Sequence, residues 1–347
     1  MALEVDITKK LDGFFMHMQF RAEREIFAIL GASGCGKSMT LKCIAGIEKP
    51  DEGRIVLDGK VLFDSEKKIN LPPQKRKVGY MFQDYALFPH MNVVQNIEAG
   101  MGKRPDRSRT ESLIRQFQLE GLEKKIPGQL SGGQKQRVAM ARMLAAEPEL
   151  ILLDEPFSAL DTYLKWQLEQ EMYKHLKEAG KPVIFVSHNR DEVYRLCDTV
   201  SCMNRGKMEV MEPLKKFFQN PKTRTAAILS GCKNISAAER VDAHTLRAVD
   251  WGVTLHVKER EIADDIRAVG IRAHFLATVE RPGEENVFPV NESEIWEDPF
   301  EWNISFRKNA ECSWLQWKIA KTDWSPAMGI PKELYLKEED ILLLMDS

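Results

Sequence analysis

Residues 130–161 read LSGGQKQRVAMARMLAAEPELILLDEPFSALD, and they constrain the fold of this chain more than any other part. The first motif in them is Leu130-Ser131-Gly132-Gly133-Gln134, followed by a basic run typical of a helix that Glu147-Pro148 ends. A serine before two glycines leaves backbone N–H groups free at a helix start, where these donors and the helix dipole favour an anion. The motif therefore predicts a turn that faces a phosphate.

The second motif in these residues is a run of four apolar residues, 150–153, that ends in Asp154 and Glu155. Such a run is typical of a buried parallel strand. In open α/β sheets, ligands bind at the carboxyl ends of the strands. We therefore expect the two carboxylates to lie at a site suited to metal chemistry, although two acids could also simply stabilise the start of the next helix.

A glycine-rich loop follows the buried strand expected over residues 25–30. It reads Gly31-Ala32-Ser33-Gly34-Cys35-Gly36-Lys37-Ser38, and Met39 begins the helix expected behind it. Glycines allow the backbone to wrap phosphates with its N–H groups inward. Lys37 can then reach the β- and γ-phosphates, and the Ser38 hydroxyl can ligate Mg²⁺. Strand, loop and helix are the context that this phosphate-binding pattern requires.

Cys35 lies inside that loop, beside the start of the helix. A helix N-terminus lowers the pKa of a nearby thiol. We therefore expect Cys35 to be reactive, so that alkylation inactivates the protein and MgATP protects it.

These motifs together resemble the ATP-binding cassette (ABC) ATPases, and the resemblance extends from about Ile26 to His188. It implies an α/β P-loop ATPase fold, with ATP and Mg²⁺ as cofactors. Gln83, after the strand expected over 77–82, takes the position of the family's Q-loop, where its amide oxygen can ligate the metal. His188 directly follows the strand expected over 182–187. It takes the H-switch position of the family, near the γ-phosphate and the attacking water. Asp161 corresponds to the D-loop.

The resemblance assigns a role to each motif. Glu155 is the general base, and His188 is the second catalytic residue, which contacts the γ-phosphate and is not a metal ligand. The Mg²⁺ ligands are Ser38, Gln83 and Asp154. The nucleotide contacts are Gly31, Ala32, Ser33, Gly34, Cys35, Gly36, Lys37, Ser38, Met39, Gln83, Ser131, Gly132, Gly133, Gln134 and Asp161.

Contact with adenine is predicted at the turn between the first two strands. Related proteins place an aromatic ring on the base, and by register this position falls near Leu11, which is not aromatic. Either Leu11 makes plain apolar contact, or Phe14 substitutes for the missing ring. Phe14 is therefore the candidate for the adenine contact.

Length and composition favour a globular chain with two domains. Its 347 residues are 43% hydrophobic and 29% charged, and no apolar run approaches the length of a membrane span. The start of the chain does not resemble a signal peptide, so we expect it to stay in the cytoplasm. The six cysteines form no close C-x-x-C pair, which favours free thiols over a zinc ribbon or a disulfide framework.

The charge differs between the two halves of the chain. Residues 1–231 hold 36 Lys and Arg against 30 Asp and Glu, whereas residues 232–347 hold 14 against 22. We expect an ATPase domain over 1–228, with a helical subdomain over about 84–146. The second domain is expected over 229–347 as a β-rich regulatory domain. Apolar residues alternate with period two in several of its segments, which suggests a small β-barrel.

Gly270-Ile271-Arg272-Ala273-His274 resembles a strand of the TOBE-type, oligonucleotide-binding-like domains attached to importer ATPases, which implies a small β-barrel. Gly231-Cys232-Lys233-Asn234 resembles chains linked to molybdate or sulfate uptake, but the Ser-Ala-Arg-Asn motif of molybdate-binding barrels is absent. Six of the seven tryptophans lie in this half. Its net charge of −8 opposes phosphate backbones, so core packing is a better explanation of them than stacking on nucleic acid.

The segment from Tyr85 to Met91 is unusually apolar for a connection. It could pack inside the helical subdomain. It could also form the rim of a groove that receives a short helix of a membrane subunit, as in related transporters.

In the geometry of the family, Ser131, Gly132 and Gly133 cap the nucleotide of a second copy of the chain. The resemblance therefore implies a head-to-tail homodimer with two ATPs at its interface. It also implies an importer ATPase at the cytoplasmic face of the membrane. Its partners would be integral-membrane permease subunits and, indirectly, an extracytoplasmic substrate-binding protein, with no nucleic acid.

Molybdate, tungstate or sulfate is the favoured cargo, and a sugar, polyamine or iron cargo is the alternative. A soluble ABC ATPase acting on nucleic acid is a further alternative. It would usually need tandem cassettes, a long coiled coil or a basic arm, and none is visible in the sequence. An exporter ATPase is disfavoured by the β-rich second half of the chain.

Overall fold

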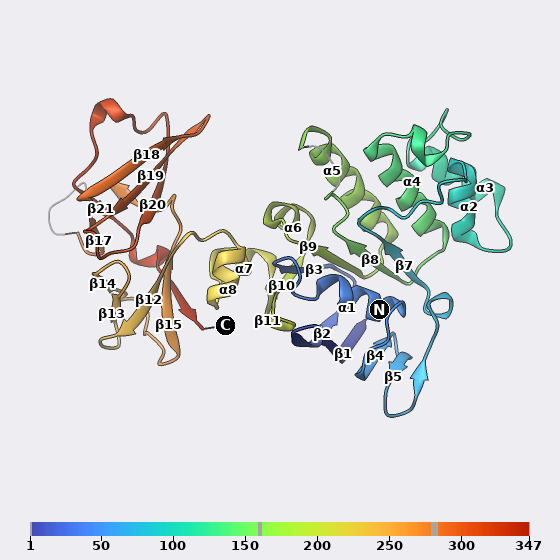
Figure 1. The fold of residues 1–347 in the computed structure, drawn as a ribbon, viewed down its shortest axis with the longest axis horizontal. Coiled ribbons are helices and arrows are strands. Elements are labelled where there is room, and N and C mark those ends of the chain that lie inside the picture. The colour runs from blue at the N-terminus through green and yellow to red at the C-terminus, as the bar shows by residue number, and fades with distance from the viewer. Residues whose placement is uncertain (1, 159–161, 279–283, 347) are drawn as a thin grey trace. The chain divides into compact units, whose positions relative to one another are not determined.

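The computed structural model describes residues 2–158, 162–278 and 284–346, and it divides into two compact units (Figure 1). The first unit comprises Met1–Leu214 and the second Lys215–Ser347. The division therefore lies earlier than the expected boundary at 228/229. The reason is local packing, because helix α8 (Arg224–Leu229) contacts strands β15 and β22 of the second unit.

A parallel sheet forms the centre of the first unit, in the order β7-β8-β9-β3-β10. Its strands are β3 (Ile26–Gly31), β7 (Val78–Met81), β8 (Leu150–Asp154), β9 (Val183–Ser187) and β10 (Thr199–Asn204). Every residue of β3, β8 and β9 is buried, as their continuous apolar runs predict. Because the strands are parallel, their carboxyl ends lie at one edge of the sheet.

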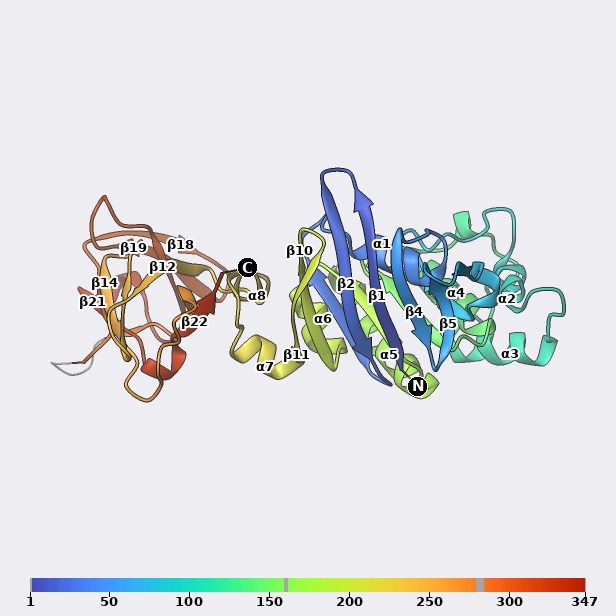
Figure 2. The same ribbon diagram turned by 90° about the horizontal axis from the view of Figure 1, so that it is seen from below.

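Six further strands extend this sheet on the side of β10, and all of them pair antiparallel except β11 with β2 (Figure 2). They are β1 (Leu3–Leu11), β2 (Phe14–Ala22), β4 (Glu52–Leu57), β5 (Lys60–Asp64), β6 (Ile69–Asn70) and β11 (Lys207–Pro213). The close approach of β1 and β4 requires a glycine, because Gly53 has a φ of +104° and a Cβ there would lie 2.1 Å from the Asp6 carbonyl oxygen.

Helix α1 (Lys37–Ala45) packs against β7, β8 and β9, and its apolar side belongs to a core shared with β1 and β2. The expected helical subdomain contains α2 (Val93–Met101), α3 (Arg107–Gln116) and α4 (Gly132–Ala145), which lie together in Figure 1. Helices α5 (Thr162–Ala179) and α6 (Arg190–Leu196) complete the first unit. No helix among the described residues combines the length and apolarity needed to cross a bilayer.

The second unit is rich in strands, as expected. It begins with α7 (Leu214–Gln219) and α8, and its sheets have the orders β14-β13-β12-β15-β22, β16-β21-β17 and β18-β19-β20. The strands are β12 (Asn234–Arg240), β13 (Thr245–Ala248), β14 (Val253–His256), β15 (Ile266–Ile271), β16 (Ala277–Thr278), β17 (Val287–Pro289), β18 (Glu292–Glu297), β19 (Glu301–Arg307), β20 (Leu315–Ala320), β21 (Glu333–Tyr335) and β22 (Leu342–Met345). Within the described residues these sheets stay open, so the expected closed barrel is not present.

Core packing accounts for three of the six tryptophans in this unit. Trp251, Trp317 and Trp324 are buried among aliphatic and aromatic side chains, and the rings of Trp317 and Trp324 are 5.9 Å apart. Trp314 is partly covered by the Arg307 guanidinium, whereas Trp296 is largely exposed. The period-two pattern therefore identified the inward side of these strands, but it did not identify Trp296 as an outward residue.

Arg76 is a fully buried side chain that fixes the carboxyl end of α1. Its guanidinium donates hydrogen bonds to the carbonyls of Cys43 and Ile44, each 2.8 Å long, and to Leu71 and Asn70. The last carbonyls of a helix have no partner within the helix, so a side-chain donor is needed where they are buried. Burial lowers the pKa of Arg76, but these acceptors hold the charged form.

We expect Arg76→Met to lower the free energy of unfolding of the first unit by about 2–4 kcal/mol, because it orphans several buried acceptors. Circular dichroism at 222 nm during urea unfolding follows the helices, most of which lie in this unit. Arg107→Met is the matched control: its exposed i,i+4 pair with Glu111 should be worth less than about 0.5 kcal/mol. Equal losses in the two variants would contradict the role of Arg76.

Candidate functional site

The loop between β3 and α1 has the conformation that its glycines allow. Gly34 and Gly36 have φ of +81° and +112°, in the left-handed region. A Cβ on Gly31 would lie 2.6 Å from the Met203 carbonyl oxygen, so a side chain there would displace the backbone of β10. Residues 32–34 are exposed, so the outer part of the loop is open to a ligand.

The Lys37 side chain reaches back across this loop. Its Nζ donates hydrogen bonds to the carbonyls of Gly31 and Ala32, each 2.8 Å long, and the residue is buried. A buried ammonium needs such acceptors, because an unpaired charge is costly to remove from water. These two carbonyls therefore hold the Lys37 ammonium beside the first residues of the loop. Met39, two residues further along α1, is half-buried and packs against the apolar core.

Cys35 differs from the expectation of a reactive thiol. Burial raises the pKa of the Cys35 thiol, and the neighbouring Lys37 opposes this effect only in part. The side chain lies beneath the loop, near the position that a Cβ on Gly31 would occupy. The expected lowering of the pKa by the helix N-terminus is therefore wrong, because desolvation of the thiolate outweighs the favourable electrostatics.

Ser38 and Asp154 bring the two sequence motifs together. The Ser38 hydroxyl donates a 2.7 Å hydrogen bond to Asp154 Oδ1, and the Tyr80 hydroxyl donates a 2.8 Å hydrogen bond to Asp154 Oδ2. Asp154 is buried at the end of β8, and both of its oxygens have a partner. Burial and the Asp154 charge raise the pKa of Tyr80 far above its usual range, so this phenol stays a donor.

The pair of Ser38 and Asp154 suits a hard divalent cation. Hydroxyl and carboxylate oxygens are ligands that Mg²⁺ accepts, and Mg²⁺ usually takes only one or two protein carboxylates, with water and phosphate oxygens completing its shell. Among the described residues, no cluster of three or more His, Cys, Asp or Glu side chains could hold a metal by itself. The site therefore fits Mg²⁺ that arrives with a phosphate ligand.

Gln83 is exposed in the turn after β7. No hydrogen bond between described residues joins it to Ser38 or Asp154, so its expected place in the metal site stays a prediction.

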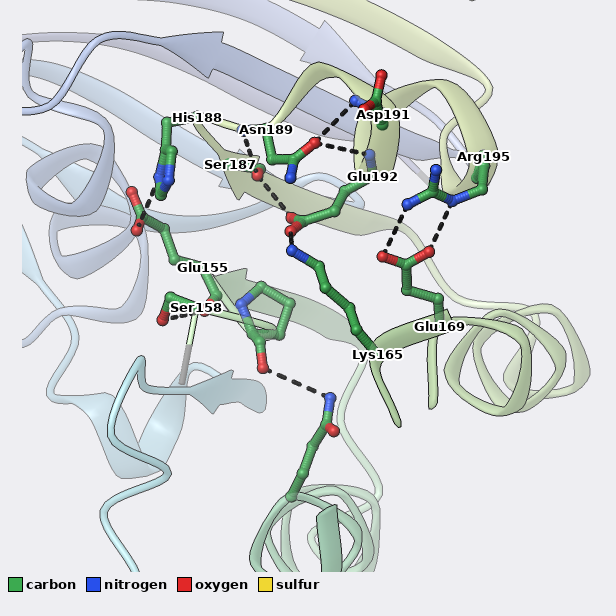
Figure 3. A network of polar contacts seen from close by, with 12 residues as sticks. Glu155, Ser158, Lys165, Glu169, Ser187, His188, Asn189, Asp191, Glu192 and Arg195 are labelled. Carbon is green, nitrogen blue, oxygen red and sulfur yellow. Dashed lines mark hydrogen bonds and ion pairs between the residues drawn. The ribbon is translucent and has the colours of Figure 1, made fainter. Parts of the chain in front are cut away.

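Glu155 and His188 come together at the ends of neighbouring strands (Figure 3). His188 Nδ1 lies 3.1 Å from Glu155 Oε2, with side-chain exposures of 52% and 15%. Glu155 has a φ of +46°, and its N–H donates a 3.0 Å hydrogen bond to the Val186 carbonyl of β9. This left-handed turn directs its carboxylate away from the partners of Asp154.

The serine-glycine turn begins α4 as predicted. Ser131 is its N-cap: the Ser131 hydroxyl accepts from the Gln134 N–H, and the Ser131 N–H donates to the Gln134 side chain. Ser131 and Gly132 are exposed, whereas Gly133 is packed where a Cβ would lie 3.0 Å from Leu168. Among the described residues, no hydrogen bond connects this turn to the Gly31–Ser38 loop of the same chain.

Two further predicted residues are not placed at the site. Asp161 lies outside the described residues. The Phe14 ring is half-buried and packs over the turn at Gly206, where a Cβ would lie 2.7 Å from its ring. Phe15, the next residue, is 67% exposed. The adenine contact therefore stays a prediction.

Tyr80 was missed by the sequence analysis, although it touches Asp154 directly. It lies opposite Leu152 in the pairing of β7 with β8. A tyrosine one residue before the end of β7 was a usable signal, because the hydroxyl of a largely covered phenol needs a hydrogen-bond partner.

A phosphate-binding loop before a helix, beside a strand that ends in two carboxylates, defines a P-loop nucleotide-binding protein. The sequence profile described as ABC transporter matches residues 16–158. The Fe(3+) ions import ATP-binding protein FbpC of Haemophilus influenzae (strain 86-028NP) is 41% identical over 249 residues, which cover 68% of this chain and 70% of that protein. The chain therefore belongs to the ABC transporter family.

Two other comparisons agree with this assignment. The molybdenum import ATP-binding protein ModC of Paramagnetospirillum magneticum (strain ATCC 700264 / AMB-1) is 40% identical over 225 residues, or 64% of this chain, and the match spans 62% of that protein. The dimeric post-hydrolysis structure of the ATP-binding cassette MJ0796, bound to ADP and Pi, superposes with a TM-score of 0.52 at 29% identity. It covers 62% of this chain and 99% of that one.

The reactivity of the cysteines tests the correction made for Cys35. At pH 8 we expect Cys312, which is only half-buried, to react first with a thiol reagent such as DTNB. Cys35 should react at least about tenfold more slowly than a free cysteine, because burial and a raised pKa both reduce accessible thiolate. Cys312→Ser should remove the fast phase, and all remaining thiols should react in denaturant. A fast phase that is instead lost in Cys35→Ser would contradict this assignment.

Proposed function

We propose that this chain is the ATP-hydrolysing subunit of an ABC importer that works as a homodimer with a separate membrane permease. The observation that carries the proposal is the separation of two adjacent carboxylates. Asp154 contacts Ser38 and Tyr80, whereas Glu155 contacts His188. Neighbouring acids with different partners suit different tasks, one at a metal ion and the other at a proton.

The residues of the loop would bind the phosphates. The backbone N–H groups of Gly31–Gly36 and the Lys37 ammonium are the donors, and Lys37 would exchange the carbonyls of Gly31 and Ala32 for phosphate oxygens. Ser38 and Asp154 would hold Mg²⁺, with Gln83 as the further predicted ligand. When bound, this ion neutralises the negative charge of the phosphates.

Glu155 is the proposed general base for the attacking water. A carboxylate carries no proton, so in its contact with Glu155 the His188 Nδ1 is the donor. In the neutral ring, Nε2 is then an acceptor. His188 thereby orients the carboxylate, and in the proposed mechanism Glu155 takes the proton from the water that attacks the γ-phosphate.

The dimer is proposed because Ser131 and Gly132 are exposed and, among the described residues, their turn forms no hydrogen bond with the phosphate loop of the same chain. In the proposed head-to-tail pair, Ser131, Gly132, Gly133 and Gln134 of one copy cap the nucleotide held by the other, and Asp161 lies at the same interface. The dimeric state in the description of the MJ0796 structure supports this arrangement.

The permease is proposed to dock beside the segment from Tyr85 to Met91. Tyr85 is buried and its hydroxyl donates a 3.4 Å hydrogen bond to the Pro156 carbonyl, which supports the packing interpretation for that residue. Phe88 and Met91 are exposed, which supports the docking interpretation for the rest of the segment. The chain would then work at the cytoplasmic face of the membrane, and an extracytoplasmic binding protein would deliver the cargo.

An oxyanion is the proposed cargo, with molybdate favoured by the ModC relative and tungstate or sulfate as close chemical analogues. Ferric iron is the alternative, because the FbpC relative has a similar identity and a somewhat longer match. The proposed β-rich regulatory domain has no assigned ligand, and nucleic acid is not a proposed partner. Copurification with an integral-membrane protein supports the importer, whereas copurification with RNA or ribosomes would refute it.

Glu155→Gln tests the base and the dimer together. We expect the rate of MgATP hydrolysis to fall by about 10²–10⁴-fold, because the amide cannot accept the proton. ATP binding should persist, and light scattering should show an ATP-dependent dimer. The double variant Glu155→Gln/Ser131→Arg is the control, since its turn cannot cap a partner's nucleotide and it should stay monomeric. An ATP-bound dimer in the double variant would contradict the proposed interface.

The cargo can be tested with the permease and binding protein encoded beside this chain. We expect the reconstituted complex to hydrolyse ATP several-fold faster when the binding protein carries molybdate than when it is empty. Sulfate, tungstate and ferric iron are the comparison ligands, added singly at equal concentration. Stimulation by ferric iron alone would replace the oxyanion assignment, while leaving the ATPase assignment intact.

A further inference from the structure

A largely buried ion pair lies beside the end of the strand that carries His188 (Figure 3). Lys165 of α5 pairs with Glu192 of α6, and their side chains are 19% and 4% exposed. Glu192 Oε2 also accepts a 2.7 Å hydrogen bond from the hydroxyl of Ser187, the last residue of β9. Both oxygens of this carboxylate are therefore occupied, one by a cation and the other by the residue that precedes His188.

Ser187 also forms a hydrogen bond with Asn189, the residue after His188. Its oxygen accepts a 2.9 Å hydrogen bond from the Asn189 N–H, so the serine and the asparagine are joined across the histidine. Asn189 is the N-cap of α6, and its side chain accepts from the N–H groups of Asp191 and Glu192. His188 is consequently a single exposed residue between two anchored neighbours.

A second ion pair repeats the arrangement one turn along both helices. Glu169 is completely buried, and its two oxygens accept hydrogen bonds of 2.6 and 2.9 Å from the Arg195 guanidinium. The signs alternate, because α5 supplies a cation and then an anion while α6 supplies the reverse. If α5 moved by one helical turn relative to α6, Glu169 would lie against Glu192, and the two negative charges would repel. The two ion pairs therefore favour a single register between the helices.

We infer that Lys165, Glu192 and Ser187 are positioning residues that hold His188 against Glu155. This inference rests on the proposed function, because it concerns the histidine of the same site. The Lys165 charge keeps the Glu192 carboxylate in place, the carboxylate fixes the Ser187 hydroxyl, and that hydroxyl fixes the backbone on both sides of His188. The position of His188 thereby depends on the position of α5, the helix that begins directly after Asp161 in the sequence.

The alternative is that the Lys165–Glu192 pair only joins α5 to α6. The Glu169–Arg195 pair separates the two explanations. It also joins α5 to α6, but among the described residues neither of its members forms a hydrogen bond with Ser187. Replacing both members of a buried pair by apolar residues avoids leaving an unpaired charge. The test therefore compares Lys165→Met/Glu192→Met with the matched control Glu169→Met/Arg195→Met.

We expect the first double variant to lower kcat for MgATP hydrolysis at least tenfold, with KM for ATP within twofold of the wild-type value. The control should keep kcat within twofold, whatever its melting temperature. In a His188→Ala background the first double variant should lower kcat no further, because it acts through that histidine. Equal losses in the two double variants, or additive losses with His188→Ala, would overturn the inference.

Ser187→Ala is a milder variant that keeps the ion pair, and it decides the question if the first double variant does not fold. We expect a lowered kcat in Ser187→Ala and recovery in Ser187→Thr, which restores the hydroxyl. A crystal structure of Ser187→Ala should show His188 separated from Glu155, and an unchanged contact would overturn the inference. The crystal structure tests the inference even if the wild-type chain hydrolyses no ATP. A lack of ATP hydrolysis by the wild-type chain would refute the proposed function, and not the positioning of His188.

Discussion

The hydrogen bond from the Ser38 hydroxyl to Asp154 joins two parts of the chain that are more than a hundred residues apart. It fixes the start of α1 to the carboxyl end of β8, and Arg76 fixes the other end of the same helix. The phosphate loop lies between β3 and α1, so its shape depends on both anchors. A helix held at its two ends by buried polar contacts can present loop donors in a defined geometry, which is what a preorganised anion site requires.

Asp154 and Glu155 show how adjacent residues can serve different partners. Along a regular strand, successive side chains already point to opposite faces of the sheet. The left-handed conformation of Glu155 adds a turn at the end of β8, and the hydrogen bond from Glu155 to Val186 stabilises it. A non-glycine residue in this region costs of order 1 kcal/mol or more, so the fold holds a local conformation that the residue alone would not choose. Such strain at the proposed base agrees with the tendency of functional sites to carry it.

The sequence predicted the elements whose signals are local. Buried runs such as 150–153, the glycine loop and the capped start of α4 have patterns that depend on a few neighbouring residues. The contact of Tyr80 with Asp154 depends instead on the pairing of two distant strands, and the contact of Lys165 with Glu192 depends on the packing of two helices. Neither is encoded in the spacing of residues along the chain.

The predictions for Cys35 and for the second unit differ from the structure because they depend on the burial and pairing of residues that are distant in the sequence. For Cys35 the helix N-terminus was visible in the sequence, but the burial that outweighs it depends on the folded loop. The division after Leu214 reflects the packing of α8 against β15 and β22, and these contacts between distant residues are not visible in the sequence of the helix. Period-two alternation identified the strands of the second unit, but alternation contains no information on which strand edges pair. The expected barrel closure therefore went beyond what the pattern could support.

The two ion pairs between α5 and α6 also bear on how movement of these helices would reach His188. A buried charge pair tolerates little lateral movement, because separating its members exposes each to a poorly solvating interior. Helices α5 and α6 should therefore move together rather than slide past each other. The Ser187–Asn189 connection then passes any such movement to a single histidine, whose ring is half-exposed and touches the proposed base. A change at the start of α5 thus has a short route, through rigid contacts, to the point where the proposed proton transfer occurs.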